Sequence, residues 1–142
     1  MEVKELLRGG QFLVKESPCD SIFTPEDFSE EQRMMKEAVK EFNEREVIAK
    51  RDRFEAKDYA LTEAVMRKAG EMGFLGVNTP TEYGGQGLTN LEAIIILEEF
   101  GKISSAVGWP VFEANAGPVK VLQHFATDAL KERVIPKVCS GE

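Results

Sequence analysis

From residue 29 onward, apolar positions recur at three- and four-residue steps, which is the spacing of an amphipathic helix. A capping box, Ser29-Glu30-Glu31-Gln32, marks the start: the serine hydroxyl and the glutamine side chain satisfy free backbone N–H groups there. The pattern predicts a long first helix from this box to about Phe54, with its charged residues on a solvated face. Its apolar stripe consists of Met35, Ala38, Val39 and Phe42.

A second helix is predicted from about Leu61, and Gly73 followed by Phe74 fits a glycine C-cap with its hydrophobic contact. Residues 75–87 are too rich in glycine and proline to be helical, so we expect a loop there. The apolar stripe of this helix consists of Leu61, Val65, Ala69 and Met72.

The third helix is predicted to follow a second capping box, Thr89-Asn90-Leu91-Glu92, and to end near Gly101. It carries five consecutive apolar residues, Ala93 to Leu97. At about 100° per residue, five consecutive positions go round the whole helix. We therefore expect this helix to be buried on every side, either as a central helix or beneath a domain outside this chain.

A fourth helix is predicted to begin at Ser104 or Ser105 and to continue to about Ala116, with Pro110 tolerated near its start. The pair Gly117-Pro118 should end it, because proline removes a backbone donor and clashes with the preceding turn.

The C-terminal part predicts a short helical piece over residues 119–125 and a last helix capped by Thr127. Pro136 is an irregularity within that last helix. Its inward-facing residues are predicted to be Leu130, Val134, Ile135 and Val138.

Residues 1–28 show no sustained helical period and contain Gly9, Gly10, Pro18 and Pro25. We interpret them as an irregular N-terminal extension with a short strand-like piece at Gln11 to Val14. The predicted fold class is therefore all-α: a helical bundle of about five to six helices over residues 29–142, preceded by the extension.

Composition supports one globular domain and argues against nucleic acid as a partner. Charged residues make up 30% of the 142 and apolar residues 42%, well away from the low hydrophobicity of disordered chains. The formal net charge is −7 and the basic residues are scattered, so nucleic acid is not expected as a partner.

The most apolar region, residues 106–125, is long enough to raise the question of a membrane span. Glu113, Lys120 and His124, together with Pro110 and Pro118, argue against a transmembrane segment. The first residues contain no uninterrupted apolar core of the length that a secretory signal needs, so a cytoplasmic location is expected.

Candidate reactive residues are few. Cys19 and Cys139 stand in no Cys/His spacing and His124 is the only histidine, so neither a metal site nor a hydrolytic triad is predicted. Both cysteines are expected to be reduced thiols. Glu113, the only acid between residues 106 and 125, either faces water or reaches into a cavity, and both interpretations stay open.

The glycine cluster Tyr83-Gly84-Gly85-Gln86-Gly87 is a weak candidate for a phosphate cradle. It follows no convincing strand, has no GK[ST] ending and does not match GxGxxG. Glycine is also the residue that adopts a positive φ without strain, so a structural turn is the better interpretation.

Three motifs together resemble one family, the acyl-CoA dehydrogenases. The first two, residues 70–76 (GEMGFLG) and 80–88 (PTEYGGQGL), are similar to that family's passage from its second helix through a P-x-E-Y-G-G-x-G loop. The third, residues 131–142 (KERVIPKVCSGE), is similar to the segment in which its N-terminal helical domain ends. The resemblance covers about residues 29–142 and agrees in order and spacing.

The resemblance implies an enzyme of three domains, a helical, a β and a second helical one, that binds FAD and an acyl-CoA thioester. In that family a glutamate removes the α-proton while the β-hydride passes to the flavin, as in fatty acid β-oxidation. Electrons then leave through an electron-transfer flavoprotein, and the complete enzyme is expected to be a homo-oligomer. The glutamate and most flavin contacts belong to later domains, so this chain alone is expected to hold no catalytic residue and to be inactive.

The resemblance also implies that this domain supplies part of the wall around the acyl chain, from the helix that corresponds to residues 105–117. Trp109 is bulkier than the family's usual side chain, and Gly117-Pro118 alters the helix end, so no acyl chain length is assigned. The implied substrate-pocket residues are Trp109, Pro110, Glu113, Ala114 and Gly117.

Other functions remain as alternatives. One is a free-standing, non-catalytic helical module, descended from such an enzyme, that binds a protein partner. Another is an acyl-CoA oxidase or a flavin monooxygenase of the same superfamily.

Overall fold

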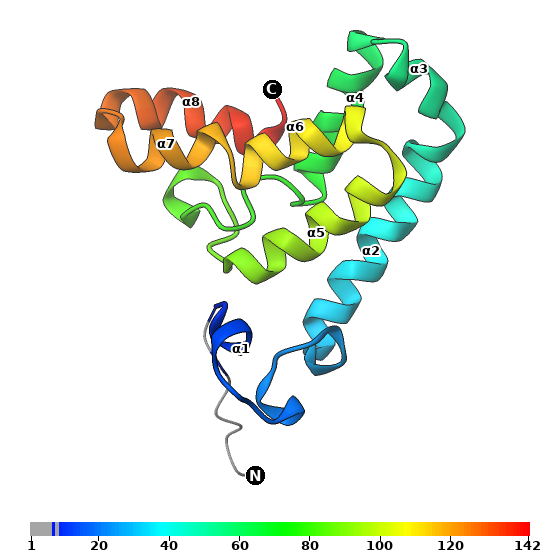
Figure 1. Cartoon of the computed structure of the whole chain (residues 1–142). Coiled ribbons are helices and arrows are strands. Elements are labelled where there is room, and N and C mark those ends of the chain that lie inside the picture. The colour runs from blue at the N-terminus through cyan, green and yellow to red at the C-terminus, as the bar shows by residue number, and fades with distance from the viewer. Residues whose placement is uncertain (1–6, 8) are drawn as a thin grey trace.

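A computed structural model describes Leu7 and residues 9–142, and Figure 1 shows helices and loops with no strand among these residues. The all-α prediction is therefore confirmed. The α-helices are α1 Gln11–Val14, α2 Glu30–Glu46, α3 Arg51–Glu55, α4 Tyr59–Glu71, α5 Asn90–Ile103, α6 Ser105–Asn115, α7 Pro118–Phe125 and α8 Asp128–Ser140. Short 3₁₀ turns cover Cys19–Ser21, Pro25–Asp27, Ile48–Lys50 and Thr81–Tyr83.

Helix α5 lies at the centre of the bundle, packed against α2 on one side and α6 on the other (Figure 1). Helix α8 packs against α7 and α4, so the last helix closes the bundle opposite the α2–α5 pair. Both predicted capping boxes are present, at Ser29 with Gln32 and at Thr89 with Glu92. They fix where the two longest helices begin.

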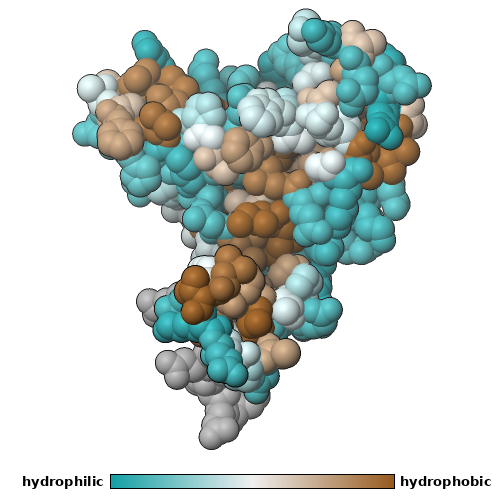
Figure 2. Space-filling model, viewed as in Figure 1, coloured by the Kyte–Doolittle hydropathy of each residue, from teal (hydrophilic) through white to brown (hydrophobic). Residues whose placement is uncertain are grey.

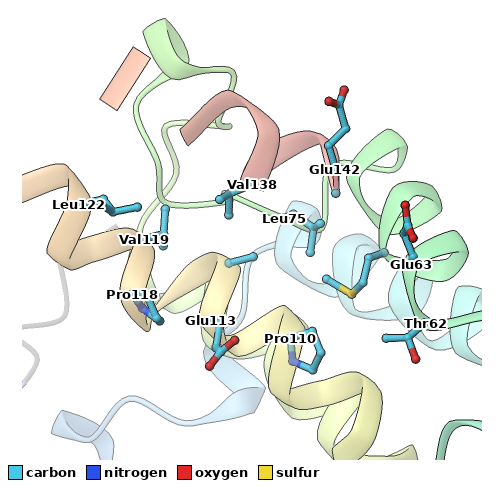
Figure 3. A pocket seen from close by; sticks show the side chains of 13 residues that line it. Thr62, Glu63, Leu75, Pro110, Glu113, Pro118, Val119, Leu122, Val138 and Glu142 are labelled. Carbon is cyan, nitrogen blue, oxygen red and sulfur yellow. The ribbon is translucent and has the colours of Figure 1, made fainter. Parts of the chain in front are cut away.

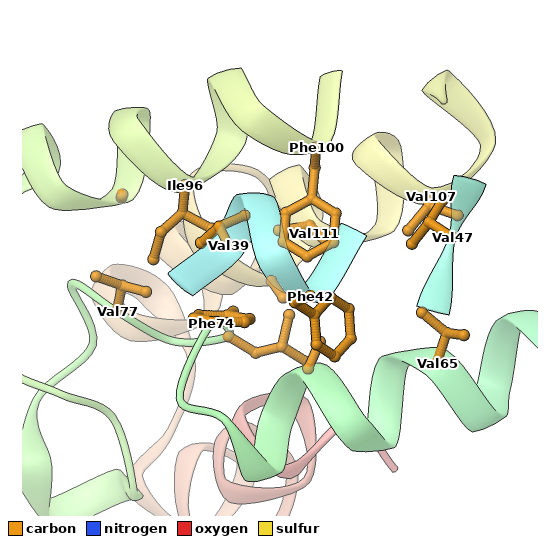
Figure 4. Close-up of a cluster of buried hydrophobic side chains, with 14 of the residues drawn as sticks. Val39, Phe42, Val47, Val65, Phe74, Val77, Ile96, Phe100, Val107 and Val111 are labelled. Atoms are coloured by element: carbon orange, nitrogen blue, oxygen red, sulfur yellow. The ribbon is translucent and has the colours of Figure 1, made fainter. Parts of the chain in front are cut away.

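Three phenylalanines form the middle of the core (Figure 4). The ring centroids of Phe42 and Phe74 are 5.5 Å apart, those of Phe42 and Phe100 5.8 Å, and those of Phe74 and Phe100 6.2 Å. All three pairs meet edge to face, an arrangement that contributes about 0.5–1.5 kcal/mol per pair beyond the burial of apolar area. The trio therefore joins α2, α5 and the start of the loop after α4.

The structure corrects two predictions near the N-terminus. Residues Gln11–Val14 form one helical turn and not a strand-like piece, because the Lys15 N–H bonds the Gln11 carbonyl at 2.9 Å and no described neighbouring strand offers a partner. The first helix ends at Glu46 and not near Phe54. A 3₁₀ turn there redirects the chain, so that Val47 and Phe54 both reach the core.

The described residues do not bury the third helix on every side, so the first alternative, a fully enclosed central helix, is wrong, while cover by a domain outside this chain stays a prediction. Ala93, Ile95 and Ile96 are buried, but Ile94 is 59% exposed. The physical reason is that α2 and α6 cover two sides of α5 and leave a third side open. The helix also continues to Ile103, two residues beyond the predicted end at Gly101.

The remaining helices follow the predictions closely. Helix α6 covers Ser105–Asn115, α7 begins at Pro118, and α8 follows Thr127 with Pro136 inside it. Gly73 has a φ of +75°, as its C-cap role requires. Within the described residues, no helix combines the length and apolar character needed to cross a bilayer.

Candidate functional site

An apolar hollow of about 380 Å³ lies between α4, α6, α7 and α8 (Figure 3), and we call it the α6 hollow. Three of the predicted pocket residues, Pro110, Glu113 and Ala114, line it from α6. The rest of its lining is formed by Thr62, Glu63, Met66, Leu75, Pro118, Val119, Leu122, Val138, Gly141 and Glu142.

The other two predicted pocket residues lie outside the α6 hollow. Trp109 is 63% exposed and lines a neighbouring hollow of about 260 Å³, together with Leu97 and Phe112. Gly117 is the residue before α7, where its N–H bonds the Phe112 carbonyl at 3.1 Å. The structure therefore brings three of the five residues together in the α6 hollow. Trp109 lines a different hollow, and Gly117 lies in the turn before α7.

Glu113 stands at the rim of the α6 hollow with an exposed side chain. Its carboxylate accepts a hydrogen bond of 3.0 Å from the indole Nε1 of Trp109, one helical turn earlier. The Trp109 ring in turn lies 5.4 Å from the ring of Phe112. Of the two interpretations left open by the sequence, both are partly right: the residue faces water and borders a cavity.

The ionisable residues of the α6 hollow are all acids: Glu63, Glu113 and Glu142. Its floor is apolar, with Leu75 and Val119 almost fully buried. Such a lining suits an aliphatic group and disfavours an anion, because no basic side chain lines the hollow, although Glu63 itself is paired with Arg67 at 2.9 Å. A phosphate-bearing part of a ligand would therefore have to lie elsewhere.

A stripe of exposed apolar side chains crosses α5 and α6. We call Ile94, Leu97, Trp109 and Phe112 the α5–α6 stripe; Ile94, Trp109 and Phe112 are exposed and Leu97 is half-buried. Figure 2 shows apolar surface gathered over this part of the molecule, above the N-terminal extension. Contiguous apolar surface of this kind marks a site of contact with further protein or ligand.

The glycine cluster holds no free phosphate cradle. The N–H groups of Gly85, Gln86 and Gly87 donate to the carbonyls of Pro80, Gly76 and Thr79 at 3.2, 3.1 and 2.8 Å. Gly84 and Gly87 have φ values of +82° and +66°. This confirms the structural-turn interpretation.

The same bonds show that the loop does not fit a nucleotide cofactor such as FAD, because its N–H groups already have partners. Over residue 7 and residues 9–142, no three His, Cys, Asp or Glu side chains gather in a way that would hold a metal ion.

Sequence reasoning missed a third hollow, between α5 and α7, that contains Lys120 and His124. The two residues are four apart, so they lie on one face of a helix. That spacing is a signal that the sequence carries, but it does not reveal that α5 supplies the facing wall of the hollow.

The chain resembles known proteins over nearly its whole length. A family model for the acyl-CoA dehydrogenase N-terminal domain matches residues 29–142. A probable acyl-CoA dehydrogenase of Bacillus subtilis (strain 168) is 30% identical over 138 residues, which cover 97% of this chain and 23% of that protein. The mitochondrial isovaleryl-CoA dehydrogenase of Pongo abelii is 30% identical over 115 residues, covering 80% of this chain and 27% of that protein.

A solved structure of acyl-CoA dehydrogenase complexed with FAD from Bacillus anthracis matches with a TM-score of 0.81 and 30% identity, over 95% of this chain and 23% of that one. The chain therefore spans about a quarter of the length of these relatives. The family model covers the whole bundle, and the fold agrees with that of the solved relative. The chain belongs to the acyl-CoA dehydrogenase family and corresponds to its N-terminal helical domain.

Proposed function

We propose that this chain is the N-terminal part of an FAD-dependent acyl-CoA dehydrogenase that oxidises acyl-CoA thioesters to 2-enoyl-CoA. Residues 1–28 form an extension and residues 29–142 the helical domain, while the flavin-binding and C-terminal helical domains lie outside this sequence. The chain contributes a wall of the acyl pocket and a surface for packing against those domains.

The observation that carries this proposal is the lining of the α6 hollow. Its volume, about 380 Å³, is within the range of small-molecule sites, and its floor is apolar. Pro110, Glu113 and Ala114 face it from the helix on which the family resemblance places acyl contacts. The absence of a basic lining residue suits an acyl tail and excludes the phosphates of CoA from this hollow.

The chain's own share in the reaction is to exclude water and to position the acyl chain. When bound by the complete enzyme, a flavin would supply the acceptor for the hydride from the β-carbon, and a base from another domain would take the α-proton. Glu113 is not assigned as that base, because its carboxylate is exposed and bonded to Trp109. A dry apolar wall strengthens the electrostatic interactions of the reacting atoms.

The α5–α6 stripe supports the proposed packing against further polypeptide. A second domain that covers Ile94, Trp109 and Phe112 would remove most of their exposed area from water, at about 25 cal/mol per Å². We further propose that the complete enzyme is a cytoplasmic homo-oligomer and passes electrons to an electron-transfer flavoprotein.

The test uses the full-length protein encoded by the gene, purified with its flavin. Under anaerobic conditions, saturated acyl-CoA thioesters are expected to bleach the flavin absorbance and to yield 2-enoyl-CoA, with an electron-transfer flavoprotein as the next acceptor. Rapid reoxidation by oxygen with hydrogen peroxide release would point to the oxidase alternative. A reading frame that lacks downstream β and helical domains would overturn the proposal in favour of a free-standing helical module.

A further inference from the structure

The hollow between α5 and α7, which we call the α5–α7 hollow, differs in charge from the rest of the surface. Its volume is about 420 Å³. It contains a lysine, a histidine and two asparagines but no acid, although acids outnumber lysines and arginines 25 to 18 in the chain. Its lining residues are Asn78, Asn90, Ala93, Ile94, Leu97, Ala116, Lys120 and His124.

Lys120 is the half-buried cation of this hollow, and no described acid forms an ion pair with it. Its ammonium donates to the backbone carbonyl of Asn78 at 2.6 Å and to the side-chain oxygen of Gln123 at 3.0 Å. Both acceptors are neutral, so the positive charge is held in place without being neutralised. Because an ammonium has three N–H donors, one remains for a further acceptor.

Burial lowers the pKa of Lys120, which shows that its surroundings disfavour the charged form. An anion placed beside the ammonium would favour its charged form and so oppose this effect of burial. His124 lines the same hollow one helical turn further along α7, and its imidazole offers a second N–H donor.

The opposite wall of the hollow is aliphatic. Ala93, Ile94 and Leu97 contribute it from α5, and Ala116 adds a methyl group from the end of α6. Ile94 is the exposed member of the isoleucine run, so a bound aliphatic group would cover surface that is open in this chain. The hollow thus combines one cationic donor face with one apolar face.

We propose that the α5–α7 hollow binds a short aliphatic carboxylate, with the carboxylate on Lys120 and the hydrocarbon against Ile94 and Leu97. Such a group has two sources: a free small carboxylic acid, or the side chain of an aspartate or glutamate from the remainder of the enzyme. The site is separate from the α6 hollow, since the two share no lining residue. The lining belongs to this chain alone, so butyrate binding can be tested separately from the proposed function, and only the acidic side chain as a source rests on that function.

The experiment titrates the isotope-labelled chain with sodium butyrate and follows backbone amide resonances by NMR. Saturable shifts are expected at Asn90, Ile94, Lys120 and His124. Two control ligands are each expected to bind at least about tenfold more weakly than butyrate. Butyramide has the same shape but no charge for Lys120, and inorganic phosphate has charge but no aliphatic tail for Ile94 and Leu97.

Variants then test the role of the cation. Lys120→Met should weaken butyrate binding at least about tenfold, while Lys120→Arg should retain it because the charge is kept. Lys137→Met is the matched control, since Lys137 is exposed on α8 and lines neither hollow. Unchanged dispersion of the core amide resonances shows that each variant is folded.

The intact enzyme distinguishes the two sources. If the natural occupant is an acidic side chain from another domain, butyrate binds the 142-residue chain and fails to bind the intact enzyme. If the occupant is a free acid, butyrate binds both, and the second domain then covers Trp109 and Phe112 of the α5–α6 stripe while Ile94 stays open to the acid. The absence of saturable shifts at the hollow, equal binding of butyramide, or loss of binding in the Lys137→Met control would each overturn the proposal.

Discussion

The side chain of Asn115 fastens α6 to the backbone around Val77. Its Oδ1 accepts the Val77 N–H at 2.8 Å, and its Nδ2 donates to the carbonyls of Phe74 and Val111 at 3.0 and 2.9 Å. Asn115 is fully buried, so these bonds have no water to replace them. The helix that lines the α6 hollow is thereby held at a fixed distance from the segment that supplies Leu75, another lining residue.

Replacing Asn115 with alanine should destabilise the chain by about 2–4 kcal/mol. The change leaves the Val77 N–H and the Phe74 carbonyl buried without their partner, at about 1–3 kcal/mol for each orphaned group. Urea unfolding followed by circular dichroism measures the loss. Asn90→Ala, at an exposed position, is the control and should cost less than about 1 kcal/mol; equal losses in the two variants would contradict the fastening role.

Gly85 and Gly101 should respond in opposite directions to a single added methyl group. A Cβ at Gly85 would lie 2.2 Å from the Thr79 carbonyl oxygen, so the loop would have to move to make room for it. Gly85→Ala should therefore lower the free energy of unfolding by more than about 1 kcal/mol. A Cβ at Gly101 meets nothing within 4 Å, and Gly101→Ala within α5 should stabilise by about 0.5–1 kcal/mol. Thermal melts of both variants check the pair; a gain from Gly85→Ala would mean that the loop tolerates a side chain.

The helical elements could be predicted because their signals are local. Both capping boxes involve residues three apart, and the stripe residues Val39, Phe42, Val65 and Ala69 are all buried as their spacing indicates. The break after Glu46 was missed because residues 47–54 continue a helix-compatible composition. Only tertiary packing, which draws Val47 and Phe54 inward, ends the helix there.

The sites were harder to predict, because each gathers residues from several elements. Asn115 stands in an apolar run and bonds backbone 38 and 41 residues away, so its burial has no local signal. Helical spacing places Trp109 and Glu113 on one face, which the hydrogen bond between them confirms. The same spacing does not reveal that Pro110 and Ala114 face one hollow while Trp109 lines another.

The exposed α5–α6 stripe should make the isolated chain bind hydrophobic dyes. Ile94→Glu places a charge on this surface without disturbing the core, so dye fluorescence and aggregation should both fall while the melting temperature stays within a few degrees. Ile96→Glu is the contrasting variant, since Ile96 is fully buried and an unpaired buried charge should unfold the chain. Unchanged dye binding in Ile94→Glu would show that another surface is responsible.

The two cysteines should differ sharply in reactivity. Cys19 is exposed, whereas Cys139 is buried and burial raises the pKa of its thiol, so the reactive thiolate is scarcer and less accessible. A thiol-reactive chromogenic disulfide at pH 8 should label one cysteine within minutes and the second only in denaturant. Cys19→Ser should abolish the fast phase and Cys139→Ser should leave it intact; a fast phase that survives in Cys19→Ser would contradict the assignment.

Trp109 should limit the length of the acyl chain in the complete enzyme, if the proposed function is right. Its indole lines the neighbouring hollow, where the Phe112 ring and a hydrogen bond to Glu113 hold it, and Glu113 in turn lines the α6 hollow. Trp109→Ala removes that bulk from an exposed position. It should raise kcat/KM for longer acyl-CoA thioesters relative to shorter ones by about tenfold or more. The reason is that each further methylene that a hydrophobic pocket accommodates stabilises the transition state by about 1–3 kcal/mol. Steady-state kinetics over a series of saturated acyl-CoA thioesters measures the ratio. Tyr59→Ala removes another exposed aromatic side chain, on α4, where it borders neither the α6 hollow nor the Trp109 hollow, and should leave the ratio unchanged. The same shift in both variants, or none in Trp109→Ala, would show that Trp109 does not bound the acyl chain.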